Sequence, residues 1–272
     1  MITKKYFDQE TDLSFLVTVS SNLSDQFECL ETAISPNTTC PTFIMAHGAG
    51  AGMDSEFMNQ MAEAIAAHNI RVVRFEFPYM HLRRIDGKKR PPNREKICLA
   101  TFADVLACWR GSDVFIGGKS MGGRMASLLA ACINGSEHTA AQLNNLETAT
   151  ESAKSISVPA GVFCLGYPFH APGKPDKCRT DHFPDINCPL HILQGERDAF
   201  GNRAEIEEKQ NKDSIWQVAE AGLIESRDQQ KYILWLPDGD HSFKPRVKSG
   251  VTLEDNIREA AKYISATINR HS

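Results

Sequence analysis

Hydrophobic positions along the chain fall into short apolar runs that alternate with longer segments carrying apolar residues on one helical face. The short runs are typical of strands buried on both faces, and the longer segments are typical of helices packed on a sheet. Because strands and helices alternate at this spacing, the pattern predicts an α/β fold with a mostly parallel sheet flanked by helices on both faces. No internal repeat or linker divides the pattern, so we expect a single domain over residues 1–272.

The expected elements follow this pattern from one end of the chain to the other. Two β-leaning stretches lie within residues 1–41 and are expected to form antiparallel entry strands at 11–20 and 26–34. Residues 134–157 are polar and are expected to form a loose connection. The buried strands are expected at 42–46, 71–77, 113–117, 160–166, 190–195 and 231–236. The helices are expected at 55–68, 94–110, 125–132, 202–225 and 253–268.

Composition narrows the class of protein. A hydrophobic fraction of 42% with 24% charged residues is ordinary for a soluble globular protein. The net charge of −4 and the pI near 6.1 give no reason to expect nucleic-acid binding. The first ten residues lack the apolar core of a signal peptide, and no apolar run is long enough to span a bilayer. We therefore expect a cytoplasmic protein that does not bind membranes.

The eight cysteines are scattered singly along the chain. No pair of them has the spacing of a zinc site or of a redox-active dithiol. Several lie inside apolar segments, where a thiol behaves as a small hydrophobic side chain. We expect reduced core residues in a reducing compartment, and neither a metal nor an organic cofactor is implied.

An apolar strand, a glycine-containing turn and an apolar helix follow one another between residues 113 and 132. The turn, Gly118 to Gly122, fits Gly-x-Ser-x-Gly with Ser120 at its centre. A serine at the apex of such a turn projects its hydroxyl outward, and flanking glycines avoid collisions with the strand and the helix. The Met121 amide then lies at the helix N-terminus, where it can stabilise an oxyanion. The pattern predicts a nucleophile elbow; the alternative is a turn that only links strand to helix.

Two residues that could activate Ser120 follow later strands. Asp198 comes directly after the strand at 190–195, and His241 comes directly after the strand at 231–236. In parallel α/β sheets the loops at the carboxyl ends of the strands collect at one edge. A serine hydroxyl becomes a good nucleophile when a histidine accepts its proton, and a carboxylate fixes the tautomer of that histidine. We therefore predict a Ser-His-Asp catalytic triad of Ser120, His241 and Asp198.

Other polar residues near these positions have competing roles. An aspartate in a loop is often a turn residue or a helix cap, and a loop histidine is usually a surface residue. Asp240 is a rival acid, but it is adjacent to His241, and a neighbouring residue rarely points its carboxylate at that ring. Lys119, beside the serine, is expected to face solvent or an acidic group. None of the rival histidines follows the final predicted strand: His170, His182 and His191.

The residues that follow the strand at 42–46 read His47-Gly-Ala-Gly-Ala-Gly. Glycines let a backbone approach a substrate closely and turn an amide toward it. We expect the second amide of the oxyanion hole to come from Ala49 or Gly50, with His47 near the pocket. Phosphate binding by this loop is the weaker alternative, because no Lys-Ser or Lys-Thr pair follows it.

Two further loops are candidates for the substrate pocket. Residues 83–94 form a dense basic cluster that includes Arg83 and Arg84, whose guanidinium groups could bind an anionic substrate. The alternative for this loop is a solvated surface. Tyr167 and Phe169 follow another buried strand and are expected to line the pocket. The sequence has no long apolar insertion of the kind that forms a lid, so we expect none.

Several longer motifs extend this interpretation, and together they resemble one branch of the α/β-hydrolase superfamily. That branch is typified by a testis-expressed protein and by the third subunit of the NSL chromatin complex, and it is related to dienelactone hydrolases. The resemblance covers roughly residues 42–268, and it implies the α/β-hydrolase fold with Ser120, Asp198 and His241 at the triad positions. Dienelactone hydrolases typically use a cysteine nucleophile, so the serine here weakens a dienelactone-type activity. The motifs are His47-Gly-Ala-Gly-Ala-Gly-Met-Asp54, Arg74-Phe-Glu-Phe-Pro-Tyr-Met80, Gly117-Gly-Lys-Ser-Met-Gly-Gly-Arg124, Leu165-Gly-Tyr-Pro-Phe-His170 with Pro172-Gly-Lys-Pro175, Gln194-Gly-x-x-Asp-x-Phe-Gly201 and Gly239-Asp-His-Ser-Phe243.

These features predict a serine hydrolase that acts through an acyl-enzyme intermediate on a small ester or thioester, in the manner of a carboxylesterase. Ser120 attacks the carbonyl, His241 carries the proton and Asp198 orients His241. The expected partner is a small-molecule substrate that is anionic if the basic cluster contacts it. The alternative from another class is a non-catalytic protein-interaction module that retains the hydrolase fold, as the resemblance also allows.

Overall fold

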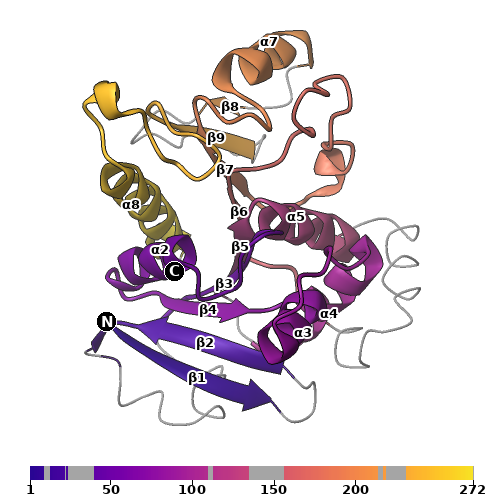
Figure 1. Ribbon diagram of the computed structural model, residues 1–272, viewed down its shortest axis with the longest axis vertical. Coiled ribbons are helices and arrows are strands. Elements are labelled where there is room, and N and C mark those ends of the chain that lie inside the picture. Colours follow the sequence, from indigo (N-terminus) through magenta and orange to yellow (C-terminus); the bar gives the residue numbers. More distant parts are fainter. Residues whose placement is uncertain are drawn as a thin grey trace.

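A single sheet of nine strands runs through the part of the protein that the computed structural model describes, which comprises residues 1–8, 13–21, 23, 40–109, 113–134, 156–213, 217–218 and 231–271. The strand order is β1-β2-β4-β3-β5-β6-β7-β9-β8 (Figure 1). The strands are β1 (Ile2–Asp8), β2 (Leu13–Val19), β3 (Thr42–Ala46), β4 (Arg71–Phe75), β5 (Val114–Lys119), β6 (Gly161–Leu165), β7 (Leu190–Gly195), β8 (Gln217–Val218) and β9 (Lys231–Leu236).

Helices cover both faces of this sheet, as expected for an α/β fold. In Figure 1, α2 and α8 lie on one side of the sheet, and α3, α4 and α5 lie on the other. The helices are α2 (Glu56–Ala66), α3 (Pro78–Asp86), α4 (Glu95–Cys108), α5 (Met121–Asn134), α7 (Arg203–Asp213) and α8 (Leu253–His271), with short 3-10 helices η3 (Phe183–Asp185) and η4 (Val247–Ser249).

The parallel part of the sheet joins β4, β3, β5, β6, β7, β9 and β8. The strand expected within residues 11–20 is β2, which pairs antiparallel with β4. The hairpin partner of β2 is β1, a strand that the sequence analysis did not predict, and its exposure largely alternates as on a solvated edge. The strand expected at 26–34 lies outside the described residues, as do residues 135–155 of the polar connection expected at 134–157.

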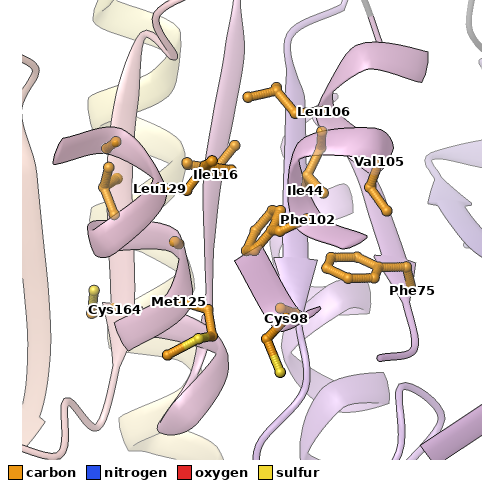
Figure 2. Close-up of a cluster of buried hydrophobic side chains, with 14 of the residues drawn as sticks. Ile44, Phe75, Cys98, Phe102, Val105, Leu106, Ile116, Met125, Leu129 and Cys164 are labelled. Atoms are coloured by element: carbon orange, nitrogen blue, oxygen red, sulfur yellow. The ribbon is translucent and has the colours of Figure 1, made fainter. Parts of the chain in front are cut away.

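Two hydrophobic clusters fill the space between the sheet and its helices. The α4 and α5 side is drawn in Figure 2, where Phe75, Ile44 and Ile116 of the central strands face Phe102 of α4 and Met125 of α5. The opposite cluster joins the other face of the same strands to α2 and α8. Each central strand is therefore buried on both faces, which explains why these strands read as continuous apolar runs.

A helix begins where the sequence analysis expected a basic loop. Pro78 occupies the first turn of α3, and Gly87, at φ 72°, ends the helix in the left-handed region. Arg83 and Arg84 lie in the last turn of α3, where cations interact favourably with the helix dipole. The loop prediction for residues 83–94 was therefore wrong for its first four residues.

The helix expected at 202–225 is also shorter than predicted. The helix α7 ends at Asp213, and Gln217 and Val218 instead form β8, which pairs with β9. Strand pairing with an already formed edge therefore overrides the helical pattern at these two residues. No helix in the described part of the chain is long and apolar enough to cross a membrane.

Candidate active site

Ser120 stands alone between β5 and α5, because Lys119 ends the strand and Met121 begins the helix. Its φ of 51° lies in the left-handed region, which costs a non-glycine residue about 1–3 kcal/mol. Backbone hydrogen bonds hold this conformation, since the Ser120 amide donates to the Leu165 carbonyl (2.9 Å) and the Arg124 amide donates to the Ser120 carbonyl (3.0 Å). The structure thus contains the strained strand-turn-helix expected of a nucleophile elbow.

The two glycines around Ser120 allow a close approach to the end of β3. A Cβ atom added to Gly118 would lie 2.3 Å from the Ala46 carbonyl oxygen, and one added to Gly122 would lie 2.4 Å from the same atom. No side chain fits in that space. Consequently the elbow packs directly against Ala46, and the loop that leaves β3 begins beside the serine.

The hydroxyl of Ser120 lies within hydrogen-bond distance of the histidine that was predicted from sequence. His241 Nε2 is 2.8 Å from Ser120 Oγ, and His241 Nδ1 is 2.8 Å from Asp198 Oδ2. In the tautomer with the proton on Nδ1, His241 donates to the carboxylate and accepts the serine proton on Nε2. This arrangement can transfer a proton away from Ser120 as its oxygen attacks a carbonyl carbon.

Asp198 is fully buried, and each of its carboxylate oxygens accepts further hydrogen bonds. Besides His241, Oδ2 accepts from Gln194 Nε2 (3.0 Å), while Oδ1 accepts from the Phe200 amide (2.8 Å). A buried carboxylate is expensive unless it is paired in this way. The hydrogen bonds fix the carboxylate plane and keep one lone pair directed at the histidine. The phenyl ring of Phe200 also covers the His241 ring, at 4.3 Å between centroids.

The rival residues make contacts elsewhere. Asp240 Oδ1 accepts from the amides of Ser242 and Lys244, so this carboxylate is directed at its own loop. The three rival histidines have their own side-chain partners: His170 contacts Glu205, His182 contacts Ser127, and His191 contacts Tyr263.

The loop that follows β3 is held by side chains on its outer side. His47 Nδ1 donates to the Gly48 carbonyl (2.7 Å), and the Phe77 amide donates to His47 Nε2 (3.1 Å). Burial lowers the pKa of His47, so the ring is neutral and suited to one donor and one acceptor role. His47 is fully buried and presents no surface to a substrate, in contrast to the position near the pocket that we expected.

The orientation of two peptide groups in this loop follows from these contacts. The Gly48 carbonyl is held by His47, and the Ala49 carbonyl accepts from the hydroxyl of Tyr79 (2.9 Å). In a trans peptide the N–H points opposite to the C=O, so the amides of Ala49 and Gly50 are turned away from these anchors. Gly48 lies beside the nucleophile, because a Cβ atom added there would be 3.8 Å from Ser120 Cβ. Both candidate amides therefore remain available to form an oxyanion hole with the amide of Met121.

A cavity of about 320 Å³ adjoins this loop and contains the two arginines of α3. Arg84 is already paired, with Nη2 at 2.6 Å from Glu76 and Nη1 at 2.8 Å from Asp54. Arg84 also holds the pKa of the Asp54 carboxyl below its usual range. Arg83 donates to the Gly50 carbonyl (3.2 Å) and forms no ion pair among the described residues. The cavity is lined by Gly50, Ala51, Gly52, Asp54, Glu76, Met80, Arg83 and Arg84.

The two aromatic residues expected to line the pocket lie in the hydrophobic core. Tyr167 and Phe169 are at most 1% exposed. The hydroxyl of Tyr167 donates to the Arg179 carbonyl (2.6 Å), and the ring of Phe169 packs against Gly201. Phe169 thus packs against the loop that carries Asp198, and neither aromatic side chain offers accessible surface to a substrate.

Lys119 was expected to face solvent or an acidic group; Asp198 and Asp240 act on its charge, but its hydrogen-bond partner was not predicted. It is 8% exposed, and its ammonium group donates to the backbone carbonyl of His241. It faces neither solvent nor an ion-pair partner within the described residues. The only signal in the sequence is its position beside Ser120, because the partner lies in a loop 122 residues away.

Among the described residues, no group of three or more His, Cys, Asp or Glu side chains is placed to hold a metal ion.

Comparison with known proteins gives a consistent picture of the fold. A family model described as an alpha/beta hydrolase domain matches residues 39–269. The chain is similar to a putative dienelactone hydrolase from Klebsiella pneumoniae, with a TM-score of 0.61 and 14% identity over 99% of this chain and 98% of the other. It is also similar to Est1E from Butyrivibrio proteoclasticus (TM-score 0.57, 11% identity, 98% and 99% covered). The chain is also similar to a dienelactone hydrolase from Anabaena variabilis, with a TM-score of 0.53 and 16% identity over 97% of this chain and 98% of the other.

Proposed function

The chain belongs to the alpha/beta hydrolase domain family, and on that premise we propose that it is a serine hydrolase that cleaves a small ester or thioester through an acyl-enzyme. The observation that carries the proposal is the unbroken chain of hydrogen bonds from Ser120 through His241 to Asp198. The fully buried carboxylate stabilises the imidazolium that forms when the histidine takes the serine proton.

The proposed reaction has two steps that use the same residues. In the first step, Ser120 Oγ attacks the carbonyl carbon while its proton moves to His241 Nε2. The proton then passes to the leaving alcohol or thiol as the tetrahedral intermediate collapses to the acyl-enzyme. In the second step, water attacks the acyl-enzyme and His241 Nε2 accepts a proton from that water. His241 then returns the proton to Ser120 Oγ as the acid is released and the free enzyme is restored. The amides of Met121 and of Ala49 or Gly50 stabilise the negative oxygen in both steps.

We further propose that the substrate carries an anionic group that lies in the cavity beside the oxyanion loop. The cavity beside the oxyanion loop contains Arg83, whose guanidinium donates to the Gly50 carbonyl and lines the cavity wall. The charge of Arg84 is already used in ion pairs with the two carboxylates of Glu76 and Asp54. Arg83 is therefore the cation in this cavity that can pair with a carboxylate or phosphate on the substrate. The motif resemblance further supports a place in the branch typified by the testis-expressed protein and the third NSL subunit.

Covalent labelling with a fluorophosphonate tests the proposed nucleophile. Intact mass should show one adduct on the wild-type protein, none on Ser120→Ala, and slow labelling of His241→Ala, because the hydroxyl needs its base. Ser242→Ala is the matched control, since Ser242 is an exposed neighbour of His241, and it should be labelled like the wild type. A folded wild-type protein that takes up no label would contradict the proposal and favour the non-catalytic interaction module.

A further inference from the structure

The side chain of Lys119 connects two separate parts of the candidate active site. Its backbone ends β5 immediately before Ser120, while its ammonium group reaches the carbonyl oxygen of His241. Lys119 is the last residue of the strand that leads to the nucleophile, and its partner His241 is the proposed base. This contact therefore ties the backbone of the base to the strand that ends at the nucleophile.

The surroundings of this ammonium group are unusual for a lysine. Its Nζ atom lies over two aromatic rings, at 5.4 Å from the centroid of Phe57 and 5.8 Å from that of Phe243. Such cation–π contacts are strongest where water is excluded. The charged groups that face it are Asp198 and Asp240, both acting at a distance that leaves no ion pair with it among the described residues. Its direct hydrogen-bond partner is therefore a backbone carbonyl.

The backbone around the contact leaves room for the ammonium group. Gly166, after β6, has a φ of 67°, and a Cβ atom added there would lie 2.8 Å from Lys119 Nζ and 2.9 Å from the His241 carbonyl oxygen. A larger residue at this position would separate the two groups. The histidine loop is also held from its other side, because Asn256 Nδ2 donates to the Phe243 carbonyl (2.8 Å).

We propose that Lys119 is a positioning residue that holds the backbone of His241 and thereby sets the distance between the base and the Ser120 hydroxyl. This inference rests on the proposed serine hydrolase function. A hydrogen bond from a charged donor is about twice as strong as one between neutral groups. Because proton transfer requires heavy atoms about 2.6–3.2 Å apart, a small shift of the histidine loop lengthens the Ser120–His241 contact and slows the attack.

A purely structural role predicts a different result from a positioning role. A buried ammonium group without an ion-pair partner is costly to desolvate, and replacing it by an apolar side chain of similar length removes that cost. Lys119→Met is therefore expected to keep or raise the Tm while it slows the reaction. A structural lysine would instead give a variant that loses stability and activity together.

The experiment compares wild type and Lys119→Met by fluorophosphonate labelling rate, by Tm and by hydrogen exchange of residues 237–244. We expect labelling to slow at least tenfold at pH 7, the Tm to be unchanged or higher, and exchange in the histidine loop to become faster. Burial lowers the pKa of Lys119 to about 8. The wild-type rate should therefore fall as the pH rises through about 8 and the ammonium loses its proton, and Lys119→Met should lack this decline.

Lys244→Met is the matched control, because Lys244 lies in the same loop with an exposed side chain. It should leave the labelling rate, the pH profile and the hydrogen exchange unchanged. Labelling of Lys119→Met at the wild-type rate, or a slower rate accompanied by a fall in Tm and an unchanged pH profile, would overturn the inference. The two readouts test the two proposals separately. A wild-type protein that takes up no label refutes the hydrolase function. Unchanged hydrogen exchange in Lys119→Met refutes the positioning role.

Discussion

Arg83 and Arg84 are neighbours on α3, yet the protein uses their charges differently. Arg84 is held by two carboxylates, whereas Arg83 contacts the oxyanion loop and lines the adjoining cavity. A charged hydrogen bond contributes about 1.5–3 kcal/mol, which is roughly tenfold or more in binding. The pair therefore allows the substrate class to be tested at a single side chain.

Arg83→Gln is expected to raise KM about tenfold for esters that carry a carboxylate or phosphate, with little effect on kcat. Neutral esters of the same size should show unchanged KM, because they do not use the charge. Arg90→Gln is a suitable control, since Arg90 is paired with Asp86 on the same exposed segment. Equal effects of Arg83→Gln on charged and neutral esters would exclude the anionic subsite.

At the scale of elements, α3 supports the loop that leaves β3. Tyr79, in the first turn of α3, donates its hydroxyl to the Ala49 carbonyl, and Arg83, in the last turn, donates to the Gly50 carbonyl. Tyr79 thereby fixes the carbonyl side of the peptide that carries the Gly50 amide, a candidate oxyanion donor, and Arg83 fixes the next peptide of the same loop. Catalysis should depend on this helix even though it contributes no residue to the triad.

Tyr79→Phe removes the hydroxyl and leaves the ring in place. We expect kcat to fall about tenfold with a smaller change in KM, because oxyanion donors act mainly in the transition state. Steady-state kinetics on a chromogenic ester measures both constants. Tyr263→Phe removes a buried hydroxyl that contacts His191 away from the site, so it should alter stability and leave kcat unchanged. A loss of kcat in both variants would indicate a general loss of packing.

The elements differ in how well the sequence predicts them, for physical reasons. Central strands such as β3 and β7 are buried on both faces, so their apolar runs are unambiguous. The helix α3 was missed because it is short and rich in charged residues, with Leu82 and Ile85 exposed and only Tyr79 and Met80 buried. The placement of Ser120, Asp198 and His241 at one sheet edge follows from the parallel topology.

Contacts across the fold were much harder to foresee. Lys119 reaches a carbonyl in a loop distant in sequence, and His47, Tyr167 and Phe169 turn inward rather than toward a substrate. The order of strands and loops along the chain predicts which loops lie close together. The direction of each side chain within a loop depends on packing against distant residues, which that order does not reveal. The single-domain organisation and the cytoplasmic location stay predictions.

At the scale of the whole molecule, the buried His191 and the partly buried His182 link stability to pH. Burial lowers the pKa of His182 to about 4 and that of His191 to about 3. The unfolded chain binds protons at these residues near pH 6.5, so the folded state binds fewer protons below that pH. The free energy of unfolding should therefore be fully retained above about pH 6.5 and should fall as the pH drops toward 4.

Each such histidine contributes a slope of up to about 1.4 kcal/mol per pH unit over this range. Urea unfolding at pH 7, 6 and 5 measures the slope. His191→Gln is expected to lower stability at pH 7, because the ring lies stacked between Phe163 and Tyr232, but also to flatten the dependence on pH. The exposed His68→Gln variant should retain the wild-type slope. An unchanged slope in His191→Gln would contradict the linkage.

The strand order has one more consequence, for variation in this protein. The loops of the candidate site leave β3, β5, β7 and β9, and each of these strands has a neighbour on both sides. The two outermost strands are β1 and β8, and neither carries a residue of the site. We therefore expect fraying, insertions or substitutions in β1 and β8 to leave the positions of the candidate catalytic residues unchanged. Sequence variation is expected to be tolerated more readily in these outer strands than in the inner strands that hold the site.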